Sequence, residues 1–540
     1  MTICHDCPSG DNYVCAHSSG RVVSLVNCLF GIFSPSRHST VESLEHLILR
    51  SVSSAVSVIM SGSGLEDSVD AGEKPHMSKD ITQAKLDTHV TEIDDEDGRD
   101  PRNWSSRKKL FVFVALMSSS ILADGGMTWG ATLIVPQALE WGVSVDHSAT
   151  SMNYGILLQG VGGLTAIPLI EAYGRLPVWL WSQFITTFMV LRATLSNNYS
   201  TFTAFRSLQG LFGTIPQVVG LPIIHDMYEP KDWPQMINIW GTTFLIGPFL
   251  GPALAGYIGA GSNWKASFGV LTAFYALSTI LIFLFGYETY YARGHQCQRN
   301  SRLQSMFGIK NHSLPVGRTL AHWTKILAIY IFKFPLLLTG IATMVNFCWP
   351  IGITVTVSTF VAQPPYLFDT VQSASLRWAP IIGGLLGYAF GYWFNGWIEK
   401  SRQQGWRPEY RLHGVWVAIG VMACGLLTYG MTLNYHKHWI GLAFGWLMVV
   451  FGMISSTVSI TAYNLEKYPD QSTVVSAIIN AWRTASGFSV GYFQPSWIAK
   501  DGTAAVFGTQ VAVVVAVLIL TITPVIVIEG RKVKPTIGEA

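Results

Sequence analysis

The sequence contains nearly the same phrase twice, "MINIWGT" at residues 236–242 and "IINAWRT" at residues 478–484. An asparagine, a tryptophan and a threonine keep their places in both phrases, at an offset of 242 residues. The flanks agree too, because each phrase follows an acidic residue and a tyrosine beside a proline ("HDMYEP" and "LEKYPD") and opens a long apolar stretch that contains glycine. The sequence therefore predicts an internal repeat with a period of roughly half the chain.

The composition is typical of a membrane protein. Of the 540 residues, 49% are hydrophobic and only 12% are charged, against roughly 25% charged in an ordinary soluble domain. Apolar segments of about 20 residues, the length that crosses a hydrocarbon core of about 30 Å as a helix, follow one another from Leu110 to Ile528. They are continuously apolar rather than alternating, which indicates helices and not barrel strands. We therefore expect an all-α polytopic membrane protein.

Twelve segments of this kind are each expected to form one transmembrane helix. They are Leu110–Gly130, Ser148–Ile170, Val178–Leu195, Phe202–Ile224, Met236–Ile258, Ala266–Gly286, Phe334–Thr356, Trp378–Ile398, Gly414–Leu433, Trp439–Ala462, Ser476–Trp497 and Ala505–Ile528.

Basic residues are concentrated in alternate loops. The segment after the sixth span has no acidic residue between Glu288 and Asp369. The positive-inside rule places such loops in the cytosol, and with an even number of spans both termini lie there too. The basic residues of this segment are Arg293, Arg299, Arg302, Lys310, Arg318 and Lys325.

The repeat leaves six spans on each side of this basic segment. We expect a disordered cytosolic tail at residues 1–105, a six-helix half at 106–290, a basic cytosolic loop at 291–328, a second six-helix half at 329–530 and a cytosolic tail at 531–540.

The first hundred residues are rich in Ser, His and Asp and end in the acidic run "EIDDEDGRD". Cys4 and Cys7 form a Cys-x-x-Cys pair, a spacing that also occurs in zinc sites. Cys15 and Cys28 do not repeat that spacing, so we favour a solvated tail over a zinc site and expect no metal or other cofactor.

Two six-helix halves related by an axis along the membrane normal are the architecture of the major facilitator superfamily. Between the second and third spans, "IPLIEAYGRLPV" resembles the loop motif of that family, with Glu171, Gly174 and Arg175 in matching places. The resemblance implies a latch between the two halves on the cytoplasmic side. Ile167 and Ala172 depart from the motif, and the second departure removes one arginine of the latch.

Two further stretches are similar to motifs of the superfamily. In the fourth span, "FRSLQGLFG" matches Arg-x-x-Gln-Gly, and in the fifth span, "GPFLGPALAG" resembles the Gly-Pro motif of antiporters. Small residues at every fourth position also let helices pack closely, so packing is the alternative interpretation of the second motif. The positions concerned are Arg206, Gln209 and Gly210, and Gly247, Gly251 and Pro252.

The resemblance is greater to fungal members of the superfamily, on the stretches "DPRNW", "YGRLPVWLWSQ", "RPEYRL" and "FGTQ" between Asp100 and Arg531. Such relatives include exporters of drugs, polyamines and secondary metabolites. The resemblance thus implies transport but does not name a substrate.

Ionisable residues inside the spans are candidates for transport, because a charge in the bilayer is costly. Asp124 lies among Leu, Ala, Gly and Met, which suits a carboxylate that exchanges a proton or pairs with a cationic substrate. The alternative is a hydrated residue at the outer interface. Arg206 could pair with Asp124 across a cavity or modulate proton release. Arg483 stands where the first phrase has Gly241, and it either snorkels to the inside or helps to bind an anionic group.

Other candidates lie near the span ends. Asp226 and Glu466 close the fourth and tenth spans at equivalent places, where we expect gate or latch contacts. Asn198 begins an Asn-Tyr-Ser sequon in a loop expected outside, which makes it a candidate for glycosylation. Aromatic residues that could line a cavity, with anchoring at the membrane interface as the alternative, are Trp129, Trp240, Phe347, Trp349 and Trp482.

We expect a secondary transporter and not an enzyme. The leading hypothesis is proton-coupled efflux of a small amphipathic molecule such as a secondary metabolite or drug, and the alternative is proton-coupled import of a nutrient. No phosphate-binding loop is evident, which argues against an ATP-driven pump. The expected partners are a small molecule, protons and the lipid bilayer, without nucleic acid, and the chain is expected to act as a monomer in the plasma membrane.

A cysteine introduced near Asn311 tests the topology. An impermeant thiol reagent added to intact cells should leave it unlabelled, because the basic segment is expected in the cytosol, and should label it once the cells are permeabilised. A cysteine near Asn198, expected outside, is the control. Labelling near Asn311 in intact cells would overturn the topology.

Overall fold

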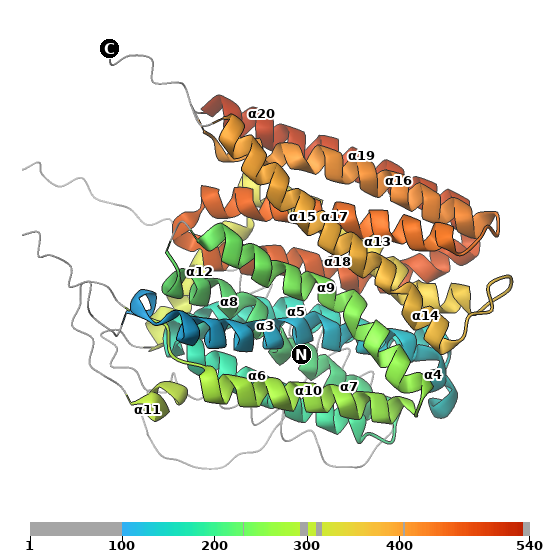
Figure 1. Cartoon of the computed structure of the whole chain (residues 1–540), viewed down its shortest axis with the longest axis horizontal. Coiled ribbons are helices and arrows are strands. Elements are labelled where there is room, and N and C mark those ends of the chain that lie inside the picture. Colours follow the sequence, from blue (N-terminus) through green and yellow to red (C-terminus); the bar gives the residue numbers. More distant parts are fainter. Residues whose placement is uncertain (1–99, 230–231, 292–300, 309–315, 403–405, 533–540) are drawn as a thin grey trace, which may run out of the picture. The chain divides into compact units, whose positions relative to one another are not determined.

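The computed structural model shows helices joined by loops, with no strand among the residues that it describes (Figure 1). The described residues are 100–229, 232–291, 301–308, 316–402 and 406–532. The all-α fold class is confirmed. Residues 1–99 of the expected N-terminal tail, with its cysteines, lie outside the described residues.

The helices fall in the following order along the chain. The α-helices are α3 (Ser106–Thr128), α4 (Ile134–Trp141), α5 (Val145–Tyr173), α6 (Arg175–Thr194), α7 (Tyr199–Gly213), α8 (Ile215–Met227), α9 (Trp233–Ala260), α10 (Trp264–Phe285), α11 (Arg302–Met306), α12 (Val316–Ile331), α13 (Phe334–Val361), α14 (Thr370–Leu376), α15 (Trp378–Ser401), α16 (Gly414–Asn434), α17 (Ile440–Lys467), α18 (Ser472–Asp501), α19 (Thr503–Val517) and α20 (Thr523–Lys532). Short 3-10 helices are η2 (Pro101–Asn103), η3 (Trp129–Thr132), η4 (Pro408–His413) and η5 (Pro469–Gln471), and η6 (Leu518–Ile522) is a π-helix.

Each of the twelve expected spans coincides with one helix or with consecutive helices, such as α7 with α8. Nine helical stretches of the described chain are long and apolar enough to cross a membrane. The other three expected spans are α6, α15 and α18, helices of 20, 24 and 30 residues that carry more polar side chains. In α18 these include Asn480 and Arg483, which are buried between helices and therefore do not face lipid.

Local sequence sets the helix ends. Ser144, Asn198 and Asn263 each accept a hydrogen bond from a backbone N–H of the following helix, which satisfies a donor that the first turn leaves without a partner. Gly174 has a φ of 108° and separates α5 from α6, a backbone conformation that favours glycine.

The packing of the helices repeats between the two halves. α3 packs against α9 as α13 packs against α18, and α5 packs against α7 as α15 packs against α17. The outer pair α6 and α10 corresponds to α16 and α19. Across the halves, α5 meets α18 and α9 meets α15. The internal repeat is therefore present in three dimensions.

The two tryptophans of the repeated phrase have matching roles. Trp240 of α9 donates its indole N–H to Ser120 Oγ of α3 at 2.9 Å. Trp482 of α18 lies against Gly340 of α13, where a Cβ would come within 2.4 Å of the indole ring. Each phrase thus docks one core helix of its half onto the first helix of that half.

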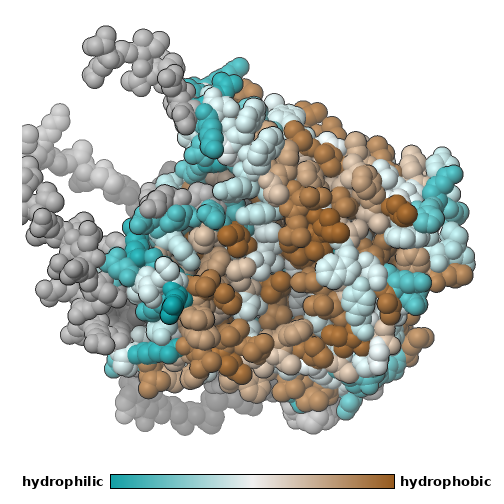
Figure 2. Space-filling view, in the orientation of Figure 1, coloured by the Kyte–Doolittle hydropathy of each residue, from teal (hydrophilic) through white to brown (hydrophobic). Residues whose placement is uncertain are grey.

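An apolar band covers the middle of the molecule, with hydrophilic residues at both ends (Figure 2). Large apolar side chains of the described helices are widely exposed, such as Leu277 at 54%, Trp393 at 61% and Leu520 at 69%. A soluble monomer rarely exposes so much apolar surface, whereas a bilayer covers it. We name the two hydrophilic ends after residues that they contain, the Arg175 end and the Glu140 end.

Four helices were not expected from the sequence. The segment expected as a basic loop contains α11 and α12, and short helices α4 and α14 precede α5 and α15. α12 places apolar residues such as Leu327 against the bundle and leaves Lys325 exposed.

Two glycines of α9 test the packing. A Cβ at Gly251 would lie 2.1 Å from the carbonyl oxygen of Gly125, so Gly251→Ala forces α9 away from α3 and should destabilise the fold by about 1–3 kcal/mol. Gly241, in the same helix, has no atom within 4 Å of a built Cβ, so Gly241→Ala is the matched control. Thermal unfolding of the purified variants in detergent measures both. Equal melting temperatures would contradict this packing of α3 on α9.

Candidate functional site

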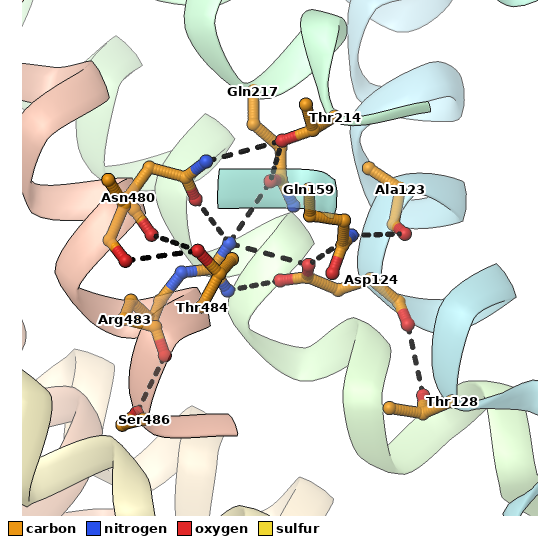
Figure 3. Close-up of polar contacts among 11 residues, drawn as sticks. Ala123, Asp124, Thr128, Gln159, Thr214, Gln217, Asn480, Arg483, Thr484 and Ser486 are labelled. Carbon is orange, nitrogen blue, oxygen red and sulfur yellow. Dashed lines mark hydrogen bonds and ion pairs between the residues drawn. The ribbon is translucent and has the colours of Figure 1, made fainter. Parts of the chain in front are cut away.

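A buried ion pair joins the two halves (Figure 3). Asp124 of α3 faces Arg483 of α18, and their side chains are 6% and 7% exposed. Nη1 of Arg483 donates to Oδ2 of Asp124, and Nη2 donates to Oδ1 at 3.3 Å, so the contact is bidentate. Charge-assisted bidentate bonds are among the strongest polar contacts in proteins. Asp124 is therefore not a hydrated residue at the interface, and Arg483 does not snorkel to the inside.

Amide side chains complete the site. Gln159 of α5 donates Nε2 to Oδ1 of Asp124 at 3.2 Å. Nη2 of Arg483 also donates to Oε1 of Gln217 in α8 at 3.0 Å and to Oδ1 of Asn480 at 2.6 Å. Both charges are thus bonded to neutral groups as well as to each other, which offsets the cost of removing them from water.

Aromatic rings from both halves flank the guanidinium. Its central carbon lies 5.3 Å from the ring centroid of Phe244 in α9 and 5.5 Å from that of Phe347 in α13. Such contacts stabilise a cation in a site with little water. Phe347 was among the expected cavity aromatics, and Phe244 was not.

Glycines let α5 and α18 approach closely around the ion pair. A Cβ at Gly160 would lie 2.6 Å from Thr484 Oγ1, and one at Gly163 would lie 2.9 Å from Asn480 Nδ2. From the other side, a Cβ at Gly491 would lie 2.3 Å from a side-chain atom of Asn153. We call this contact of α5 with α18 the glycine seam. The second copy of the repeated phrase therefore faces the opposite half.

Arg206 does not pair with Asp124, contrary to the expectation. It is 1% exposed, and it donates Nη1 to the carbonyl oxygen of Gly126 (2.8 Å) and to Oε1 of Gln209 (2.6 Å). Nη2 donates to the carbonyl oxygen of Met127. Because α3 ends at Thr128, these carbonyls belong to its last turn and need external donors. Arg206 thus caps α3.

The other residues of that motif are structural as well. Gln209 donates Nε2 to the hydroxyl of Tyr275 at 3.2 Å. A Cβ at Gly210 would lie 2.0 Å from the carbonyl oxygen of Gly155, so this glycine sets the contact between α7 and α5.

Arg175 is the centre of a charge cluster in the first half. Its Nε lies 3.2 Å from Oδ2 of Asp226, and its Nη1 lies 3.7 Å from Oε2 of Glu171. The carboxylate of Glu288, which follows α10, accepts the backbone N–H groups of Arg175 and Leu176 at 3.1 and 3.2 Å. A carboxylate at this helix N-terminus is favoured by the helix dipole. These partners all belong to the first half.

The second half has a corresponding cluster. Nε of Arg411, in η4, donates to Oε1 of Glu466 at 2.7 Å, and Nη2 of Arg411 lies 3.2 Å from Oε2 of Glu399. Lys467 lies 2.5 Å from Oε2 of Glu529. Glu466 and Glu529 follow Asp226 and Glu288 by 240 and 241 residues, close to the period of the repeat.

A separate contact joins the halves at the Arg175 end. Ser472 Oγ, at the start of α18, lies 3.2 Å from Nδ1 of His225 in α8. His225 directly precedes Asp226, which pairs with Arg175. The motif that was expected to latch the two halves therefore lies next to this contact, but its own ion pairs join residues of the first half.

The Gly-Pro segment packs α9 onto α3 directly behind Asp124. Gly247 and Gly251 both lie against Gly125, and the carbonyl of Pro252 accepts the hydroxyl of Thr132 at 2.9 Å. The packing interpretation of this motif therefore agrees with the structure.

The same helix links the halves at the Glu140 end. The hydroxyl of Tyr257 lies 3.0 Å from Ser375 Oγ of α14, and the indole N–H of Trp378 donates to Tyr257 at 3.1 Å. The halves therefore contact each other at both ends of the bundle.

The remaining expected aromatics pack among helices. Trp129 donates to Ser267 Oγ at 3.0 Å within the first half, and Trp240 and Trp482 have the positions described above. Trp349 of α13 is buried, with its ring 6.4 Å from that of Phe493 in α18. Of the five, Phe347 is the one in contact with the Arg483 guanidinium.

The structure also places two short sequence motifs, the sequon at Asn198 and a Gly-x-Ser-x-Gly string. Asn198 is exposed at the start of α7, where its Oδ1 accepts the backbone N–H of Thr201 at 2.8 Å. The string Gly-Phe-Ser-Val-Gly at 487–491 has the spacing of a hydrolase nucleophile elbow, which requires a strand-to-helix turn. Here it lies inside α18, and Ser489 Oγ donates to the carbonyl of Ser486.

Comparison with known proteins identifies the family. Residues 113–491 match the model of the Major Facilitator Superfamily. The chain belongs to the major facilitator superfamily. It is therefore a multi-pass membrane transporter of small molecules, and its relatives are transporters and not enzymes.

Curated relatives of the superfamily include fungal transporters of low identity. The chain is 23% identical to "Efflux pump radE" of Floropilus chiversii over 478 residues, which covers 84% of this chain and 86% of the relative. It is 24% identical to "MFS-type transporter tndD" of Aspergillus flavipes over 470 residues, which covers 79% of this chain and 84% of the relative.

Solved structures of the superfamily share the fold. The human organic anion transporter MFSD10 superposes with a TM-score of 0.53 at 16% identity and covers 76% of this chain and 99% of that structure. The proton:xylose symporter XylE gives a TM-score of 0.54 at 12% identity, with 77% and 96% covered. At such identities the likeness shows the fold alone.

Sequence reasoning missed the amide residues of the site. Gln159 and Gln217 are polar residues inside apolar spans, and that burial cost was a usable signal. Glu288 and Arg411 lie next to the spans, where charged residues are common, so no comparable signal marked them.

Neutralising each partner of the ion pair separately should give unequal effects. Arg483→Met leaves Asp124 as a buried carboxylate that lacks its cation, and should cost about 3–5 kcal/mol. Asp124→Asn should cost less, because the amide still accepts from Arg483, which also keeps Gln217 and Asn480. The double variant should be more stable than Arg483→Met alone.

Thermal unfolding in detergent provides the measurement, with the exposed Lys437→Met as the control. Strictly additive effects of the two substitutions would show that Asp124 and Arg483 do not interact.

Proposed function

We propose that the protein is a proton-coupled exporter of a small amphipathic molecule, with Asp124 as the coupling carboxylate. The observation that carries the proposal is the ion pair between Asp124 and Arg483, because it is buried inside the helix bundle and joins the two halves. Transport in this fold requires the halves to move against each other around a central site.

Protonation changes the energy of this contact. A proton on Asp124 removes the negative charge, and Arg483 then faces neutral acceptors alone, which are the carbonyl oxygen of the protonated carboxyl and the amides of Gln217 and Asn480. The neutral pair binds α3 to α18 less strongly, which favours separation of the halves along the glycine seam. A cationic group of a substrate could displace Arg483 from Asp124, and an acidic group could bind Arg483 once Asp124 is protonated.

Export is the direction that the relatives support. "Efflux pump radE" covers most of this chain, and its name describes an exporter. The Gly-Pro segment, which resembles the antiporter motif, packs behind Asp124 and so connects the motif with the proposed coupling site. Proton-coupled import remains the second candidate. We further propose that the transporter resides in the plasma membrane with the Arg175 end in the cytosol, and that Glu171, Arg175, Asp226 and Glu466 act in gating.

Asp124→Asn is the direct test of coupling. Cells with and without the protein are loaded with a panel of amphipathic metabolites and drugs, and accumulation is measured with and without a protonophore. The wild type should lower accumulation of its substrate, and the protonophore should abolish this effect. Asp124→Asn should reach the membrane in normal amount but lose proton-driven transport.

The matched control is Asp146→Asn, which removes an exposed carboxylate at the start of α5 and should transport normally. Full, protonophore-sensitive transport by Asp124→Asn would exclude Asp124 as the coupling group, and Glu171, Asp226 and Glu466 would be tested next. Raised instead of lowered accumulation would show import.

A further inference from the structure

Two cations share one aromatic ring at the Arg175 end. Nζ of Lys108, in the first turn of α3, lies 4.2 Å from the ring centroid of Tyr287 and 3.5 Å from that of Trp104. The guanidinium carbon of Arg302, at the start of α11, lies 4.6 Å from the same Tyr287 ring. Tyr287 follows α10, so the group combines residues from α3, from the end of α10 and from α11.

Within the described part of the chain, no carboxylate neutralises the positive charge of this group. Among the described residues, no carboxylate lies within ion-pair distance of Lys108 or Arg302. Glu288 is next to Tyr287 in sequence, but its carboxylate bonds the N-terminus of α6. The N-terminus of α3 adds the positive end of a helix dipole at the same place.

Arg302 is fixed by hydrogen bonds, and Lys108 lies against the two rings. Arg302 donates Nη2 to the carbonyls of Phe283 and Leu284 at 2.7 and 2.6 Å, which fixes α11 against the end of α10. The indole N–H of Trp181 in α6 donates to the carbonyl of Met306 at 3.0 Å and holds the other end of α11. Lys108 is half-buried and Arg302 is exposed, so an anion can reach both.

Apolar side chains continue from this group into the membrane band. Leu303 and Phe307 of α11 are 66% and 64% exposed, and Leu110 of α3 is 56% exposed. Phe283 at the end of α10 is 53% exposed. An apolar surface beside a basic group that contains tryptophan and tyrosine is the arrangement of a membrane–water interface.

We infer that Lys108, Arg302 and the rings of Trp104 and Tyr287 form a binding site for the head group of an anionic phospholipid. The phosphate and its acidic head group lie between the two cations, and the acyl chains lie along Leu110, Leu303 and Phe307. A phospholipid fits better than free phosphate, because the exposed apolar residues beside the cations need a covering that a free ion does not provide. The bound lipid would stabilise the contact of α3, α10 and α11 at one leaflet, whatever the transported substrate is.

The test is the affinity of the full chain for phosphatidylserine against phosphatidylcholine, measured by native mass spectrometry of protein purified in detergent and titrated with each lipid. The wild type should bind phosphatidylserine more tightly. Each basic residue near an anionic surface contributes about a fivefold gain, so Lys108→Ala should weaken the preference about fivefold and Lys108→Ala with Arg302→Gln about 25-fold.

Among the described residues the Lys108 side chain makes no hydrogen bond. Lys108→Ala alone therefore still tests the inference if Arg302→Gln disturbs α11. Lys108→Arg should restore the preference, and Lys437→Ala, exposed beyond α16 at the Glu140 end, should leave it unchanged. An equal preference in Lys108→Ala and the wild type would overturn the inference. So would competition by millimolar inorganic phosphate that removes the lipid from the wild type, because the ligand would then be the free anion.

Discussion

Opposite charges in a site with little water hold the two halves of this transporter together. A guanidinium and a carboxylate each lose several kcal/mol of hydration when buried, and this loss is offset only where they meet with good geometry and further hydrogen bonds. Asp124, Arg483 and the amides of Gln159, Gln217 and Asn480 satisfy that condition. Any state in which the halves separate must therefore hydrate both charges, neutralise Asp124 or provide new partners.

The repeated phrase explains how one half came to supply the cation. Both copies place a tryptophan against the first helix of their half, so that position is fixed by packing. The position after it is free of that constraint, since a Cβ at Gly241 would meet no atom within 4 Å. In the second copy the same position is Arg483, which points to the opposite half. The two copies of the phrase therefore differ in charge at the position after the tryptophan.

At the Arg175 end, each half has an arginine that pairs with carboxylates of its own half. Arg175 is surrounded by carboxylates of the first half, and Arg411 by carboxylates of the second. These clusters can stay intact while the halves move. The polar contacts that such a movement must break include the ion pair, His225 with Ser472 and Tyr257 with Ser375. In the glycine seam, the side chains of Thr484, Asn480 and Asn153 lie against glycines of the facing helix, so separation there loses close packing.

The sequence by itself determined the membrane-spanning helices, their order and the repeat, because a bilayer admits few solutions. A span needs about 20 apolar residues with all backbone groups bonded internally, and both conditions are local. Asp124 could be selected for a related reason, since a carboxylate inside a span is costly wherever it lies. Its partner was decided only by the tertiary structure. Arg483 is 359 residues away in the sequence, and the packing of α18 on α5 brings it to Asp124. Arg206, in the same half as Asp124, instead donates its hydrogen bonds to the carbonyls at the end of α3. No local rule encodes that choice, because it depends on how whole helices pack.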